Sequence, residues 1–105
     1  MAQFDVHSNR DAESRKRFPF LLDVQSDVLG VLATRVVVPL ADRDTVPVPP
    51  AERLMPAFEV DGRRVVMLTP QIAGVPKAAL GAAVASLAHL RHEIVAALDV
   101  LVSGV

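Results

Sequence analysis

The chain has 105 residues, of which 51% are hydrophobic and 4% aromatic, with no Cys, Trp or Tyr, and its 11 basic and 12 acidic residues give a net charge of −1. This length favours one small domain over residues 1–105, the absence of Cys excludes a disulfide scaffold and a thiolate metal site, and the balanced charge argues against a protein that binds nucleic acid directly by itself. No uncharged apolar run reaches the roughly 18–20 residues that span a bilayer, and no signal-peptide pattern stands at the start, so we expect a cytoplasmic protein without membrane contact.

The first quarter of the chain predicts two strands joined by a loop. Residues 3–7 alternate polar and apolar side chains, which is the period of a strand with one buried face. Residues 8–17 hold no large apolar side chain and several turn formers, so they predict an exposed loop. The apolar run of residues 18–24 predicts a second strand. Pro19 places the start of that strand at a sheet edge or a bulge, because proline cannot donate to the ladder.

The middle of the chain predicts a third strand and a hairpin. Residues 25–27 interrupt the second strand, and the β-branched run within residues 34–40 predicts the next one, with Pro39 again at an edge or bulge. Residues 42–53 predict a long loop that three prolines stiffen. Asp61-Gly62 lies between two strand-like runs, 55–60 and 64–68. This pair predicts a hairpin, because both turn positions favour positive φ.

The last part of the chain predicts a helix. Pro76 precedes a helix-forming stretch, which is a favourable helix start. From Val84 to Val102 one apolar stripe recurs at helical spacing, and Ser103-Gly104 ends it; the stripe comprises Leu87, Leu90, Ile94, Leu98 and Leu101. A single helix of this kind needs a sheet to cover. The expected fold is therefore mostly β (α+β), a small curved antiparallel sheet or barrel of about five or more strands with a long C-terminal helix.

Candidate catalytic residues are few. His89, His92 and Glu93 place two imidazoles on neighbouring turns of the predicted helix, but the pattern lacks the ligand set of a catalytic zinc site, so we expect a solvated helix face. Several Asp residues near strand ends suit either acid–base or magnesium chemistry or, more simply, turns: Asp23, Asp27, Asp42, Asp44 and Asp61. No nucleophile elbow or glycine-rich phosphate loop occurs. We expect no enzyme, no metal and no cofactor; a small metal-dependent enzyme is kept as the remote alternative.

Two features favour binding over catalysis. The run Arg15-Lys16-Arg17 suits phosphate or an acidic peptide, although a solvated loop is the more common explanation of such a run. The surplus of apolar residues indicates buried interface with a partner.

The chain resembles the CcdB family, the toxin half of a type II toxin–antitoxin module. Residues 20–29, which contain the sequence Asp-Val-Gln-Ser-Asp followed by two aliphatic residues, carry the resemblance most clearly. Residues 35–41 resemble the family's Arg-x-Val-Ile-Pro-Leu-Ala strand, and residues 67–76 resemble the segment after its hairpin. Gln3-Phe4-x-Val6 and Leu87-x-His89 fit as well, in the same order and spacing.

This resemblance implies an SH3-like small barrel that forms a symmetric homodimer. It also implies a toxin that binds the A subunit of DNA gyrase and traps the cleaved-DNA complex without covalent chemistry of its own. A CcdA-like antitoxin with a disordered tail would neutralise the toxin, the two would co-repress their operon with the antitoxin contacting DNA, and the module would serve plasmid maintenance. By position, the gyrase-facing residues are Val28, Leu29, Asp99, Val102, Ser103, Gly104 and Val105.

The chain departs from the family at its C-terminus. The family ends in Trp-Gly-Ile, and its Trp stacks on an arginine of gyrase, whereas this chain ends in Ser103-Gly104-Val105 and has Asp99 where the family has Asn. The alternative is therefore an antitoxin-binding homologue with weak or altered toxicity or a different target. The antitoxin contact is expected at Arg15, Lys16 and Arg17.

Overall fold

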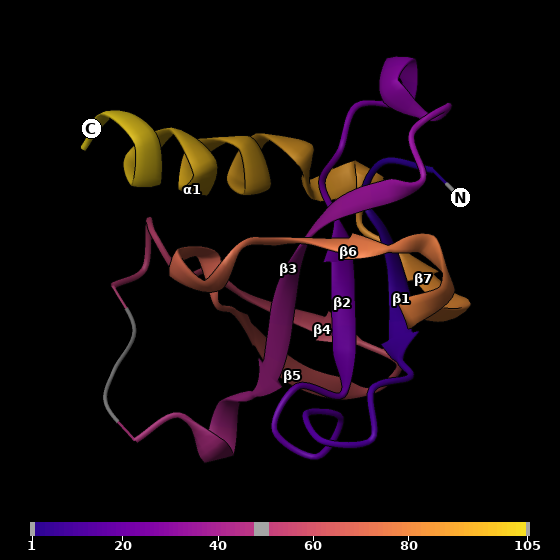
Figure 1. The fold of residues 1–105 in the computed structure, drawn as a ribbon. Coiled ribbons are helices and arrows are strands. Elements are labelled where there is room, and N and C mark those ends of the chain that lie inside the picture. The colour runs from indigo at the N-terminus through magenta and orange to yellow at the C-terminus, as the bar shows by residue number, and fades with distance from the viewer. Residues whose placement is uncertain (1, 48–50, 105) are drawn as a thin grey trace.

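The structure of the protein, a computed structural model, describes residues 2–47 and 51–104 (Figure 1). In this part of the chain it contains seven strands, five short 3₁₀ turns and one α-helix. The strands and helix are β1 (Asp5–Asn9), β2 (Phe20–Asp23), β3 (Thr34–Asp42), β4 (Ala57–Val60), β5 (Arg63–Met67), β6 (Ala73–Pro76), β7 (Leu80–Ser86) and α1 (Arg91–Ser103).

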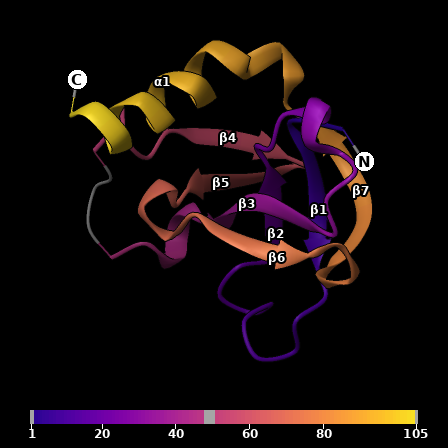
Figure 2. The same ribbon diagram turned by 45° about the horizontal axis from the view of Figure 1, so that its top comes forward.

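All strands pair antiparallel in one sheet, in the order β4-β5-β3-β2-β1-β7, and β6 pairs with the first half of β3. The sheet curls into an open half-barrel, and α1 packs across one side of it (Figures 1 and 2). Ile94 and Ala97 on α1 are fully buried against strand residues that include Val6, Leu22 and Val38. The predicted fold class, a small SH3-like curled sheet with a C-terminal helix, is confirmed.

The predicted hairpin is confirmed in its geometry. Asp61 and Gly62 have φ values of 52° and 77°, so both turn residues adopt the positive φ that this short loop requires. Val60 and Arg63 face each other across the first rung of the β4–β5 ladder. The first three predicted strands also form, with shifted ends: Phe4 has a φ of 70°, so β1 begins at Asp5 and extends to Asn9 in the predicted loop.

The prediction of a helix start at Pro76 and a helix from Val84 is wrong. Pro76 ends β6, and residues 80–86 form β7, which pairs with β1 across two register shifts. Alanine favours helices, but that preference is weak and pairing with a partner strand overrides it. The helix begins at Arg91 and ends at Ser103, so its C-terminal boundary is as predicted. Of the predicted stripe, Leu87 and Leu90 precede the helix, and Leu101 is 37% exposed.

Pro39 does not lie at an edge, because β3 is the central strand. Its backbone faces the gap between two partners: β6 pairs with residues 34–37 of β3, and β5 pairs with residues 40–42. The carbonyl of Pro39 accepts a hydrogen bond from the Leu68 amide at 3.0 Å. Since N–H and C=O of one strand residue point to the same side, the missing donor falls in this gap. Pro19 precedes β2, so its missing N–H leaves no hydrogen bond of the β2 ladder unmade.

The predicted long loop over residues 42–53 contains a 3₁₀ turn, Arg43–Thr45. Pro49 and Pro50, two of the three prolines expected to stiffen it, lie outside the described residues.

Candidate functional site

Large exposed apolar side chains gather in two places. The loop patch follows β2 and comprises Val28, Leu29, Val31 and Leu32, with Val28 87% and Val31 92% exposed. The C-terminal patch closes α1 and comprises Leu101 and Val102, with Val102 85% exposed, and the exposed residues Ser103 and Gly104 follow it. Grouped apolar side chains on a soluble domain mark surfaces that bind partners. Val28 and Leu29, predicted from the resemblance, both belong to the loop patch.

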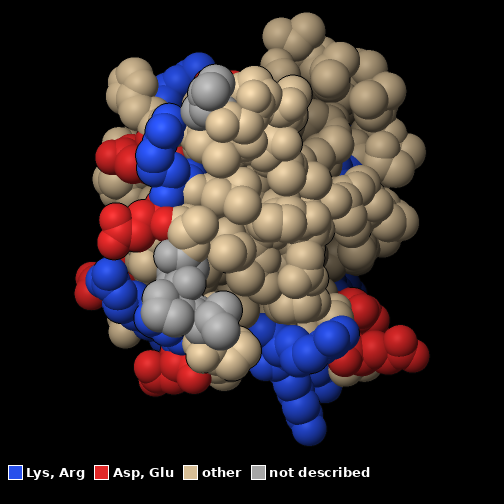
Figure 3. Space-filling view, turned by 90° about the vertical axis from the view of Figure 1, so that its left-hand side faces the viewer, with Lys and Arg blue, Asp and Glu red and all other residues tan. Residues whose placement is uncertain are grey.

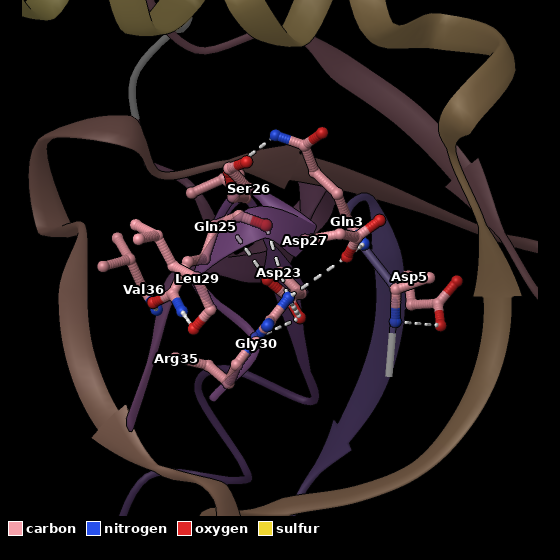
Figure 4. Close-up of polar contacts among 12 residues, drawn as sticks. Gln3, Asp5, Asp23, Gln25, Ser26, Asp27, Leu29, Gly30, Arg35 and Val36 are labelled. Atoms are coloured by element: carbon pink, nitrogen blue, oxygen red, sulfur yellow. Dashed lines mark hydrogen bonds and ion pairs between the residues drawn. The ribbon is translucent and has the colours of Figure 1, made fainter. Parts of the chain in front are cut away.

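A buried polar cluster lies beneath the loop patch (Figure 4). The Arg35 side chain from β3 is buried and forms an ion pair with Asp23 at the end of β2, with 2.6 Å between Nη2 and Oδ2. The Arg35 Nε–H donates to the same carboxylate at 2.8 Å, and Nη2 donates to the Gln25 carbonyl at 3.3 Å. A buried charge is tolerated only when paired and hydrogen-bonded. This cluster meets both conditions.

The cluster extends into the loop through Gln25. The Gln25 side chain donates to the Leu29 carbonyl at 3.1 Å and accepts from the Val36 amide at 3.0 Å, so it joins the loop to β3. The Asp27 carboxylate accepts from the Gln3 amide at 2.9 Å and lies 3.8 Å from Arg35. The contacts of Gln25 and Asp27 hold the loop in place while its apolar side chains point to solvent.

A further contact ties the end of the loop to the segment after β6. The Lys77 ammonium donates to the Gly30 carbonyl at 2.7 Å, across 47 residues of chain. At the other end, the Ser26 hydroxyl accepts from the Val28 amide and caps the 3₁₀ turn Asp27–Leu29. The loop patch is therefore presented on a backbone held from three sides.

The Asp residues that the sequence singled out are mostly used in structure. Asp23 accepts from the Gln25 amide at 3.0 Å, which is the turn role expected of it. Asp42 binds Arg63 through two hydrogen bonds, of 3.0 and 2.6 Å. This carboxylate holds the pKa of the Arg63 guanidinium above its ordinary value.

The end of α1 has a simple geometry. Gly104 adopts a φ of 76°, and its amide donates to the Val100 carbonyl at 2.9 Å, which is a glycine C-cap. The Ser103 hydroxyl donates to the Asp99 carbonyl at 2.7 Å, so it is bound to its own helix. Asp99 is exposed near this end, and the last turn carries no basic side chain to offset the helix dipole. Val105 lies outside the described residues.

The structure separates the predicted gyrase-facing residues into two groups. The turn Asp27–Leu29, a purple coil, and the C-terminal end of α1 lie at opposite ends of the molecule in two views (Figures 1 and 2). One protomer therefore does not bring Val28 and Leu29 together with Asp99, Val102, Ser103 and Gly104.

Arg15, Lys16 and Arg17 are exposed in the loop between β1 and β2. This loop lies at the end of the sheet away from α1 (Figures 1 and 2). The Arg17 guanidinium stands 5.0 Å from the centre of the Phe18 ring, a cation–π contact that orients it.

The predicted histidine cluster does not share one helix. His89 lies in the 3₁₀ turn Ala88–Leu90, whereas His92 and Glu93 begin α1, and all three side chains are exposed. Among residues 2–47 and 51–104, no group of three His, Cys, Asp or Glu side chains is placed to hold a metal ion.

Charge is unevenly spread over the surface. The side of the molecule that contains the end of α1 shows a broad uncharged area with charged side chains along its left and lower margins (Figure 3). This agrees with the sequence, in which Lys77 is the only Lys, Arg, Asp or Glu between residues 65 and 90. An uncharged centre with a charged rim is typical of a protein–protein interface.

Arg35, Gln25 and Gln3 were not singled out from the sequence as parts of the site. The available signal was the charge of Arg35 inside a β-branched run, because a charged residue in a buried strand must have a partner. Val31 and Leu32 also belong to the loop patch without having been predicted.

In the described part of the chain, no helix has the length and apolar character needed to cross a membrane. In a comparison with protein families, the family model described as CcdB protein matches residues 3–104.

Proposed function

The chain belongs to the CcdB family of toxin–antitoxin toxins, and from this premise we propose that it binds the A subunit of DNA gyrase and traps the cleaved-DNA complex. The observation that carries the proposal is the loop patch. Val28 and Leu29 occupy the positions that the family resemblance relates to gyrase, and the structure holds them in the open on a braced backbone. Such pre-organisation favours binding, because less entropy is lost when the partner arrives.

The proposed gyrase contacts are Val28, Leu29, Asp99, Val102, Ser103, Gly104 and Val105. Within the C-terminal group, the exposure of Val102 supports a contact with gyrase, but Ser103 has no ring to stack on an arginine. A desolvated cation–π contact of this kind is worth roughly 0.5–2 kcal/mol. We therefore assign the larger share of gyrase binding in this chain to the loop patch.

The partners follow from the same premise. Residues 1–105 would form a single toxin domain, and two copies would associate as a homodimer, for which the uncharged surface in Figure 3 offers a suitable face. A CcdA-like antitoxin would bind at Arg15, Lys16 and Arg17, neutralise the toxin and provide the DNA contacts for joint repression of the operon. The protein itself would act in the cytoplasm without catalysis, and the pair would serve plasmid maintenance.

The test is a gyrase cleavage assay with purified protein, gyrase and supercoiled plasmid, stopped with detergent and protease. We expect linear DNA to accumulate with added protein and to be reduced in Val28→Glu. Val84→Glu is the matched control, since Val84 is also an exposed valine but lies on β7. Absence of linear DNA at every protein concentration, together with normal growth on induced expression, overturns the proposal.

Ser103 and Asp99 favour a second candidate, an antitoxin-binding homologue with weak or altered toxicity or a different target. The substitution Ser103→Trp separates the two. Under the second candidate, the Trp variant traps gyrase and the unmodified protein does so poorly. Equal trapping by both proteins removes the basis of the second candidate.

A further inference from the structure

Lys77 stands alone in an uncharged part of the chain. It is the only Lys, Arg, Asp or Glu between residues 65 and 90, and among the ion pairs of the described residues it forms none. It directly follows Pro76, the last residue of β6, and it is only partly exposed. An ammonium group that is partly withdrawn from water needs a hydrogen-bond acceptor. The acceptor that Lys77 has found therefore indicates what this residue does.

Lys77 holds the loop at two carbonyl groups. Its ammonium donates to the Gly30 carbonyl at 2.7 Å, and its backbone amide donates to the Ala33 carbonyl at 3.1 Å. One residue therefore fixes both ends of the segment 30–33, which leads from the loop patch into β3. The two bonds, which we call the Lys77 clamp, continue the ladder between β3 and β6, since the end of β6 lies beside the start of β3 (Figures 1 and 2).

The clamp presents two apolar side chains to solvent. Val31 and Leu32 lie between the clamped carbonyls and are 92% and 45% exposed. The Leu32 amide donates to the Leu29 carbonyl at 3.1 Å, so the backbone between the clamped positions is itself ordered. An apolar side chain on a mobile loop lowers its free energy by packing against the protein surface. Because its backbone is clamped, Val31 stays in the open instead.

Val31 continues the surface that we assign to gyrase. The family resemblance relates only Val28 and Leu29 of this loop to gyrase, and Val31 follows them within the same loop patch. The other proposed contact group is weakened in this chain, because Ser103 has no ring to stack on a partner. A few buried side chains supply most of the free energy of a protein–protein interface. An added valine in the loop patch is thus suited to replace part of what Ser103 does not provide.

We propose that Lys77 is a positioning residue for gyrase binding: its clamp holds Val31 outward, and Val31 contacts the A subunit of gyrase beside Val28 and Leu29. The inference rests on the proposed function and deepens it, because it adds one contact residue and one residue that acts through it. Lys77 itself makes no contact with gyrase in this arrangement. Since the clamped segment is ordered before gyrase binds, less conformational entropy is lost on association.

Val31→Ser tests the contact. The full chain is titrated into the gyrase cleavage assay, and the protein concentration that gives half of the maximal linear DNA is measured. We expect Val31→Ser to need about tenfold more protein, which corresponds to about 1.4 kcal/mol, because an apolar contact is lost. Val84→Ser is the matched control, since Val84 is an exposed valine on β7, and it should behave as the unmodified chain does. Thermal unfolding shows that both variants are folded.

Lys77→Met tests the clamp, because it keeps an unbranched side chain but removes the donor to Gly30. We expect about fivefold more protein for half-maximal trapping, and faster hydrogen exchange of the Leu32 amide in the chain without gyrase. Lys77→Arg retains a donor and should bring both measurements back toward those of the unmodified chain. The double variant of Lys77→Met with Val31→Ser should need no more protein than Val31→Ser alone, because Lys77 acts through Val31.

The inference is overturned if Lys77→Met traps gyrase as well as the unmodified chain, if Val31→Ser and Val84→Ser behave alike, or if the two single losses add in the double variant. A smaller oligomer of Val31→Ser in sedimentation, with unchanged trapping, would assign Val31 to a contact between two copies and also overturn it. All these outcomes leave trapping by the unmodified chain intact. Absence of linear DNA with the unmodified chain contradicts the proposed function, and the inference fails with it.

Discussion

Arg35 and Asp23 form an ion pair of 2.6 Å in which the two side chains are 2% and 0% exposed. It joins the start of β3 to the end of β2, directly below the loop patch (Figure 4). A buried pair contributes little net stability when compared with a well-packed apolar pair, but removal of one partner leaves an uncompensated charge. Its value to this protein is therefore positional: it fixes where the loop leaves the sheet.

Substitution of one partner should destabilise the fold far more than substitution of both. We expect Arg35→Met to destabilise the fold by about 3–5 kcal/mol, because Asp23 is left buried and unpaired. The double variant Asp23→Leu with Arg35→Met should recover part of that loss. Urea unfolding of the two single variants and the double variant measures this coupling. Simple addition of the two single losses would contradict the assignment.

Asp27 tests the loop without disturbing the core, because its carboxylate is 63% exposed. Asp27→Ala removes the acceptor for the Gln3 amide. We expect a stability loss of about 1 kcal/mol or less, faster hydrogen exchange at the Gln3 and Leu29 amides, and about fivefold more protein needed to trap gyrase, which corresponds to about 1 kcal/mol.

Asp44→Ala is the matched control for Asp27, since Asp44 is an exposed carboxylate in another 3₁₀ turn. Unchanged exchange and trapping in Asp27→Ala, or equal changes in both variants, would show that Asp27 does not hold the loop.

The sequence predicted those elements whose signal is local. The Asp61-Gly62 hairpin and the glycine stop at Gly104 depend on positive φ at known positions, and both form where they were predicted. β6 and β7 were missed because residues 73–86 are rich in Ala and Gly, and their strand state comes from pairing with β3 and β1. Such pairing is tertiary and leaves no local mark.

The candidate site was predictable to a similar degree. Val28 and Leu29 were found through the family resemblance, and their exposure is a feature of the fold. The bracing of the loop was not predictable, because its partners are distant in sequence: Gln3 meets Asp27, and Lys77 meets Gly30. Only the folded sheet brings these pairs together.

The predicted helix stripe divides into buried and exposed parts, which gives a third prediction. Ile94→Ala should cost about 2–5 kcal/mol, because it empties fully buried space between α1 and the sheet. Leu101→Ala should cost less than about 1 kcal/mol, since Leu101 is partly in solvent. Thermal or urea unfolding measures both. Similar losses for the two variants would mean that the C-terminal turn of α1 is packed, contrary to the structure.

Gly81 on β7 and Gly74 on β6 offer a matched pair on strands that are consecutive in the chain. A Cβ at Gly81 would overlap the Ser8 hydroxyl and lie 2.9 Å from the Ser8 carbonyl oxygen, whereas a Cβ at Gly74 meets nothing within 4 Å. We expect Gly81→Ala to destabilise the fold by about 1–3 kcal/mol, because β1 must move away from β7. Gly74→Ala should be neutral or slightly stabilising, by up to about 1 kcal/mol. Equal stability of the two variants would exclude the close approach of β1 and β7.

The loop between β1 and β2 carries an acid-sensitive turn. The Ser14 hydroxyl, and after it the Glu13 amide, hold the pKa of Asp11 below its ordinary value of 3.8. Because the pKa in the folded loop is lower than in the unfolded chain, the contribution of Asp11 is complete above the ordinary value. It is lost as the pH falls through the lowered pKa. The loop should therefore keep its turn at neutral pH and loosen only in acid.

Ser14→Ala removes the larger cause of that shift, so the pKa of Asp11 should rise toward 3.8 and the turn should loosen at a higher pH. Carboxyl chemical shifts followed by NMR between pH 2 and pH 6 measure the titration of Asp11 directly. Ser86→Ala is the control, because its hydroxyl accepts from the Ala88 amide elsewhere in the fold. An Asp11 titration that is the same in the unmodified chain and in Ser14→Ala would show that the hydroxyl does not hold the carboxylate.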